Sequence, residues 1–157
     1  MPTPGTICPI SSAKRRALDA RNTRELLLDV DVHEMVRVKE AILALPLERE
    51  LLLNLCLAAE ECFVNICSYA FPDGTPEDEK ICFTLSLSDR VMLRFSDGGQ
   101  PYDPTGHVET PENYDPDTQL GGLGKFLSVS VVDDVQYEYR DQKNILTLTK
   151  YFKEETL

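Results

Sequence analysis

The residues best suited to chemistry lie in the stretch 58–71, which reads AAEECFVNICSYAF. In a helix, Glu61, Asn65 and Tyr69 recur one turn apart and share a face. The rise per residue separates Glu61 from Asn65 by about 6 Å along the axis. A carboxamide oxygen can bind Mg²⁺, and a carboxylate beside it can accept a proton. The polar edge of an ordinary amphipathic helix would look the same, so the pair alone does not decide between these interpretations.

A second candidate is Asp97, which ends a run of alternating apolar residues. The alternation predicts that its side chain points toward the core, on the same side as Val91, Leu93 and Phe95. A buried carboxylate needs a hydrogen-bond donor, such as an amide or the exocyclic amine of adenine. Gly98 and Gly99 lack a Cβ and would let a planar base come close to the backbone. The alternative is a simple turn, because Asp-Gly commonly ends strands.

A third candidate is the glycine-rich turn made of Gly121, Gly122, Leu123 and Gly124. Backbone N–H groups in such a turn, at the start of a helix, can bind phosphate oxygens. Lys125 is the nearest cation in the sequence and would lie beside these phosphates. A glycine-rich turn alone is weak support for a nucleotide site.

The elements that must position these residues follow from periodicity. Strands are predicted over 26–32, 81–88, 91–95, 135–140 and 146–149, and helices over 33–45, 48–69 and 125–132. Valines in the last of these segments also favour a strand. Each strand has one apolar face, which favours helices covering a single face of the sheet. We therefore predict an α/β (α+β) two-layer sandwich with a mixed, mostly antiparallel sheet of about five strands.

Composition limits the class of protein. The chain has 157 residues and a net charge of −11, which disfavours direct binding to nucleic acid or to an anionic membrane. No secretion signal and no membrane-spanning run of 18 apolar residues is expected. The five cysteines form no CxxC pair, which argues against a zinc site or a disulfide framework and favours the reducing cytoplasm. We expect a flexible basic arm over 1–24 and one domain over 25–153.

Taken in order, the motifs resemble the ATP-binding domain shared by gyrase, heat-shock chaperones and histidine kinases. Within that group they are most similar to the small stand-alone anti-sigma-factor serine/threonine kinases of bacteria. The resemblance covers about 25–152. It is carried by the segments 61–71 (ECFVNICSYAF), 97–104 (DGGQPYDP), 121–124 (GGLG) and 139–148 (YRDQKNILTL).

The resemblance implies a Bergerat-type fold that binds ATP and Mg²⁺. It implies Glu61 as the catalytic base, Asn65 as the Mg²⁺ ligand, Asp97 on adenine and 98–120 as a lid. The other predicted nucleotide-binding residues are Tyr69, Gly99, Tyr102, Gly121, Gly122, Leu123, Gly124 and Lys125. It further implies a homodimer that binds a sigma factor, or phosphorylates a serine on an antagonist protein, or both.

The predicted lid departs from this pattern in its charge. Five carboxylates and no cation lie in it, namely Asp103, Glu109, Glu112, Asp115 and Asp117. Such a lid would not offset the charge of a γ-phosphate. The alternative is therefore a non-catalytic module that senses nucleotide and sequesters a partner.

Overall fold

A computed structural model describes residues 23–103 and 132–152. The predicted arm up to residue 22, most of the lid, the glycine-rich turn at 121–124 and the helix at 125–131 lie outside the described residues. These predictions therefore stay predictions.

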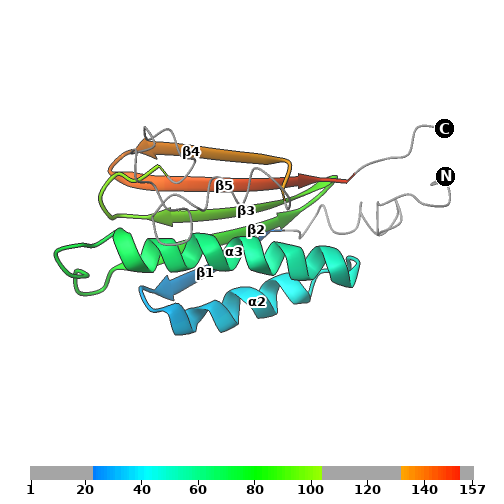
Figure 1. The fold of residues 1–157 in the computed structure, drawn as a ribbon, viewed down its shortest axis with the longest axis horizontal. Coiled ribbons are helices and arrows are strands. Elements are labelled where there is room, and N and C mark those ends of the chain that lie inside the picture. Colours follow the sequence, from blue (N-terminus) through cyan, green and yellow to red (C-terminus); the bar gives the residue numbers. More distant parts are fainter. Residues whose placement is uncertain (1–22, 104–131, 153–157) are drawn as a thin grey trace, which may run out of the picture.

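The sheet has five strands in the order β1-β2-β3-β5-β4 (Figure 1). The strands are β1 (Thr23–Asp29), β2 (Lys80–Leu87), β3 (Arg90–Asp97), β4 (Asp134–Arg140) and β5 (Lys143–Tyr151). All four strand pairings are antiparallel. We predicted a mostly antiparallel, mixed sheet, and the described sheet contains no parallel pair. In the sheet, β5 and not β4 lies beside β3, although β4 comes first in the chain. Because β3 and β5 are antiparallel, the start of β5 lies next to the end of β3.

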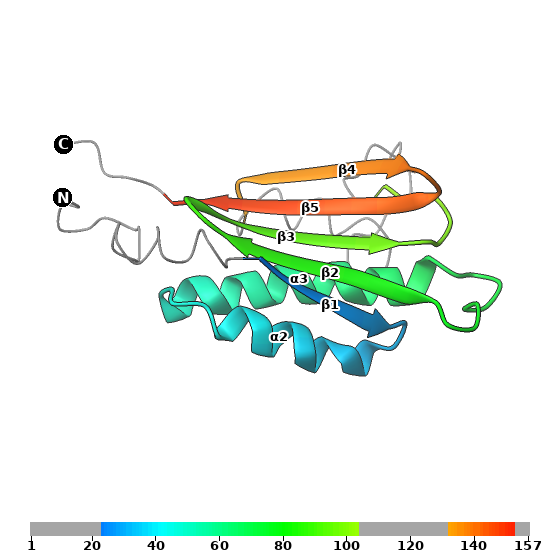
Figure 2. The ribbon, with the colours of Figure 1, turned by 180° about the vertical axis from the view of Figure 1, so that it is seen from behind.

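The helices lie on one face of the sheet, as predicted (Figures 1 and 2). They are α2 (Met35–Leu43) and α3 (Arg49–Tyr69), preceded by a 3₁₀ turn, η1 (Val32–Glu34). The two layers meet at aromatic side chains. Phe63 of α3 packs on Phe95 with ring centroids 6.2 Å apart, and Phe95 packs on Phe83 at 5.0 Å. All three rings are fully buried, which fixes the height of α3 above β3.

The boundary between β1 and the first helix differs from the prediction. The strand ends at Asp29, not at 32, because the Asp31 N–H donates to the Asp29 carbonyl at 2.9 Å and the chain turns there. The Asp31 side chain then accepts the His33 N–H and begins η1. Two apolar residues in the turn, Val30 and Val32, had extended the alternation past the true end of the strand.

The long helix α3 is more apolar than expected. By length and composition alone it could span a membrane, with a mean hydropathy of 1.5 over an 18-residue window, a feature that we did not predict from the sequence. Seven of its residues are buried in the described structure, and several of them face the sheet across the core. The core therefore accounts for part of this apolar composition, whereas Leu53, Leu57 and Val64 are exposed.

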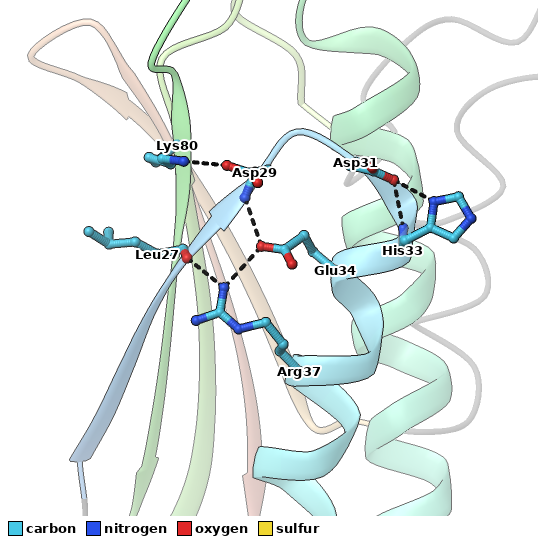
Figure 3. A network of polar contacts seen from close by, with 7 residues as sticks. All are labelled: Leu27, Asp29, Asp31, His33, Glu34, Arg37 and Lys80. Carbon is cyan, nitrogen blue, oxygen red and sulfur yellow. Dashed lines mark hydrogen bonds and ion pairs between the residues drawn. The ribbon is translucent and has the colours of Figure 1, made fainter.

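Side chains cover the free edge of β1 near its C-terminal end (Figure 3). Arg37 Nη1 donates to the Leu27 carbonyl and to Glu34 Oε2, both at 2.9 Å. The same Glu34 oxygen accepts the Asp29 N–H at 3.0 Å, and Asp29 also pairs with Lys80. Backbone groups of an edge strand that are bonded in this way cannot pair with another strand. The network therefore ties β1 to the start of α2.

Replacing Arg37 with methionine should lower the free energy of unfolding by about 1 kcal/mol. Methionine keeps the apolar stem but leaves the Leu27 carbonyl without its donor. Urea unfolding measures the change. His33→Ala is the control, because loss of the exposed His33–Asp31 pair should leave the free energy of unfolding nearly unchanged. An equal loss in the two variants would contradict a special role for Arg37.

Candidate functional site

Asp97 lies at the end of β3 and points toward the helix layer, as its place in the alternation predicted. Its exposed fraction is only 3%. The Gly99 N–H donates to Oδ1 of Asp97 at 2.8 Å, and Asn144 Nδ2 donates to the same oxygen at 3.0 Å. The carboxylate is thus buried but hydrogen-bonded, which is the condition for keeping it charged.

The charge state of Asp97 reflects competing effects. Burial raises the pKa of its carboxyl group above the usual value, whereas the hydrogen bonds from Asn144 and Gly99 lower it. Glu79 raises this pKa and Lys143 lowers it through space. The net shift is upward. Asp97 is therefore a strong acceptor for which an additional donor would be favourable.

Asn144 is a buried site residue to which sequence reasoning assigned no role, although it lies within one of the motifs that carry the resemblance. It stands opposite Asp97 in the register of β3 and β5. Alternation with Leu146 and Leu148 places it on the core face, but the sequence does not say which strand lies beside it. Tyr137 of β4 was missed for the same reason, and its hydroxyl donates to Asn144 Oδ1 at 2.5 Å.

A pocket of about 350 Å³, including its open mouth, lies beside Asp97. It brings together three of the predicted site residues, Asn65, Asp97 and Tyr102. Tyr69 does not line the pocket, but its ring lies 6.2 Å from that of Tyr102. The lining residues are Cys62, Asn65, Ile66, Ala70, Asp97, Tyr102, Tyr137, Asn144 and Leu146. The pocket therefore has apolar walls and a few convergent polar groups, as small-molecule sites do.

The loop after β3 is docked on the end of α3. The Gln100 N–H donates to the Ala70 carbonyl and its side-chain Nε2 to the Tyr69 carbonyl, both at 2.9 Å. These bonds satisfy carbonyls that a helix end leaves free. Gly99 is in closest contact, because a Cβ there would lie 2.5 Å from both the carbonyl oxygen and the Cβ of Ala70. Glycine is therefore required at 99 for close packing of two backbone segments.

Replacing Gly99 with alanine should destabilise the fold by about 2 kcal/mol or more. The clash is with backbone atoms of α3, so relief requires the loop to separate from the helix. Urea unfolding measures the loss. Gly98→Ala is the matched control, because the nearest atoms to its Cβ would be in side chains, Glu79 Oε1 at 2.7 Å and Lys143 Nζ at 3.5 Å. Equal losses for the two glycines would contradict the close approach of loop and helix.

Glu61 and Asn65 differ in their relation to the pocket. Glu61 is exposed on α3 and does not line the pocket, whereas Asn65, one turn later, does. Residues 23–103 and 132–152 contain no cluster of three His, Cys, Asp or Glu side chains able to hold a metal. Magnesium needs few protein ligands when phosphate oxygens and waters complete its shell. A single carboxamide at Asn65 fits that requirement.

The pocket also fits the adenine ring of ATP in its chemistry. Asp97 offers a buried acceptor for an exocyclic amine, and Ile66 and Leu146 offer apolar contact. The predicted phosphate-binding residues Gly121, Gly122, Leu123, Gly124 and Lys125 lie outside the described residues. Their role, like that of Asp97 toward adenine, stays a prediction.

Comparison with known proteins agrees with this architecture. Serine/threonine-protein kinase BtrW of Bordetella bronchiseptica is 39% identical over 101 residues, which cover 62% of this chain and 69% of that protein. Serine-protein kinase RsbW of Listeria monocytogenes is 31% identical over 107 residues, which cover 64% of this chain and 66% of that protein. The chain thus spans about two thirds of these relatives.

The family model of the histidine kinase-like ATPase domain matches residues 26–150. Since that match covers most of the chain, including β2, β3, β4 and both helices, the chain belongs to the histidine kinase-like ATPase domain family.

Proposed function

We propose that this protein is an ATP-binding serine/threonine protein kinase of the anti-sigma regulatory type, acting in the cytoplasm. The observation that carries the proposal is the buried acceptor Asp97 in a pocket that is also lined by Asn65. The names of the two relatives, both serine kinases, support the same activity. Its partners would be a sigma factor, an antagonist protein that carries the target serine, or both, bound by a homodimer.

Each of three residues would have its own role in binding or phosphotransfer. Asp97 would accept a hydrogen bond from the 6-amino group of adenine, and Asn65 would hold Mg²⁺ among the phosphates. Bound Mg²⁺ would supply charge neutralisation for phosphoryl transfer. Glu61 is exposed one turn before Asn65, so a serine on a docked protein could reach its carboxylate. Glu61 would orient that hydroxyl and accept its proton.

The direct test is phosphotransfer from γ-labelled ATP to a purified candidate antagonist. We expect label on a serine of the antagonist, and Mg²⁺ chelation should abolish it. Binding is measured separately, because Mg-ADP should raise the thermal midpoint if it binds the native state. Absence of both transfer and thermal shift would reject the proposal.

The second candidate is a nucleotide-sensing module that sequesters a partner without transferring phosphate. The acidic composition of 98–120 favours it, because this segment carries five carboxylates and no Lys or Arg that could offset the charge of the phosphates. Label transfer and partner capture distinguish the kinase from the sensing module. A Mg-ADP thermal shift without label transfer, combined with nucleotide-dependent capture of the partner, would select the sensing module.

A further inference from the structure

We propose that Asn144 is a positioning residue that acts through Asp97 and makes the pocket select a base with an exocyclic amine. Its carboxamide holds one oxygen of the Asp97 carboxylate and turns the other toward the pocket. The inference rests on the proposed function, in which Asp97 binds the base. It adds a determinant of base selectivity on β5, outside the elements that carry the predicted site residues.

The hydrogen bonds on Asp97 are unequally shared between its two oxygens. Both bonds that the described residues donate to it reach Oδ1, from the Gly99 N–H at 2.8 Å and from Asn144 Nδ2 at 3.0 Å. The carboxylate plane is thereby anchored from two directions. Oδ2 is the oxygen available to a ligand in the pocket that Asp97 and Asn144 both line.

The orientation of the Asn144 amide is itself determined by its neighbours. Its Oδ1 accepts from the Tyr137 hydroxyl at 2.5 Å and from the Tyr102 N–H at 3.2 Å. Its Nδ2 also approaches the Gln100 carbonyl at 2.8 Å and the Gly99 carbonyl at 3.3 Å. A flipped amide would set its NH₂ against the Tyr102 N–H and its oxygen against two carbonyls. The donor side of Asn144 must therefore face Asp97.

This arrangement determines which base the pocket accepts. A donor on Oδ1 favours the ionised form of Asp97, so Oδ2 can only accept a hydrogen bond. The 6-amino group of adenine supplies the matching donor. The 6-oxo group of hypoxanthine would place an acceptor against the carboxylate, and a buried polar group left unpaired in this way is costly.

The test compares ADP with inosine diphosphate, which lack a γ-phosphate and differ at position 6 of the base. Wild-type protein should bind ADP about 10- to 100-fold more tightly than inosine diphosphate. Asn144→Leu removes the Nδ2 donor together with both acceptor bonds of Asn144. This variant should lose most of the ADP preference, while its affinity for inosine diphosphate changes less than about threefold.

The ratio of the two affinities separates the possible outcomes. Tyr139→Phe is the control, since Tyr139 lies on the same strand as Tyr137, is exposed and does not line the pocket, and it should keep the ADP preference. An unchanged ratio in Asn144→Leu, or an equal loss of both ligands, would overturn the positioning role alone. Wild-type protein that binds neither diphosphate would instead overturn the proposed function.

Discussion

Glu61→Gln is expected to reduce phosphotransfer to a partner serine by about 10²- to 10⁴-fold, the range typical of a lost general base. Glutamine keeps the length and polarity of the side chain but cannot accept the proton. Affinity for Mg-ADP should stay within about twofold of wild type, because Glu61 is exposed and lies outside the pocket lining. Single-turnover transfer of labelled phosphate, with ADP binding measured in parallel, checks both halves of the expectation.

The neighbouring residue provides the matched control. Glu60 precedes Glu61 on α3 and pairs with Lys39 at 3.3 Å, on the side of the helix that faces α2. Glu60→Gln removes the same charge and should leave transfer within about twofold of wild type. A kinase that tolerates Glu61→Gln, or that loses as much activity in Glu60→Gln, would exclude Glu61 as the base.

Asp97→Asn is expected to weaken nucleotide binding by about 100-fold or more, the cost of replacing a charged acceptor with a mismatched group in a buried site. The new amide oxygen would accept from Gly99 and Asn144 in place of Oδ1. Its NH₂ would then face the pocket and oppose the amine of adenine, donor against donor. Calorimetric titration with Mg-ADP measures the loss.

The same substitution should leave the free protein as stable as wild type, or more stable, at neutral pH. Burial raises the pKa of Asp97 above 3.8, so the native state binds a proton more readily than the unfolded chain. As pH rises through this window the unfolded state ionises first, and the contribution of Asp97 to stability falls. Acidification should therefore stabilise wild type relative to Asp97→Asn. Urea unfolding at neutral and mildly acidic pH checks the sign.

Nucleotide binding should respond to pH in the opposite direction. Protonated Asp97 loses its negative charge, so wild-type affinity for Mg-ADP should fall as pH is lowered toward the pKa of this group. Asp97→Asn has no such group and should show a flatter profile. Loss of stability together with loss of binding in Asp97→Asn at neutral pH would mean that the carboxylate is structural, and would contradict its assignment to the base.

Local periodicity accounts for the parts of the fold that were predicted correctly. Alternation along 91–97 predicted that Asp97 points into the core, and helical spacing along 48–69 predicted the long helix α3. Each prediction needs only the side-chain direction relative to its own element. The end of β1 was predicted wrongly, because Val30 and Val32 continue the apolar alternation through a turn, in which the backbone of Asp31 bonds to Asp29.

The sequence by itself thus determined the strands, the long helix, the inward direction of Asp97 and the resemblance to an ATP-binding family. Only the tertiary structure decided that Asn144 lies opposite Asp97, that Gly99 packs against Ala70, and that Asn65 but not Glu61 lines the pocket. The physical reason is that periodicity reports which way a side chain points from its own backbone. Which strands become neighbours, and in what register, depends on contacts between residues far apart in the chain, such as the pairing of β3 with β5 across 47 positions at Asp97 and Asn144.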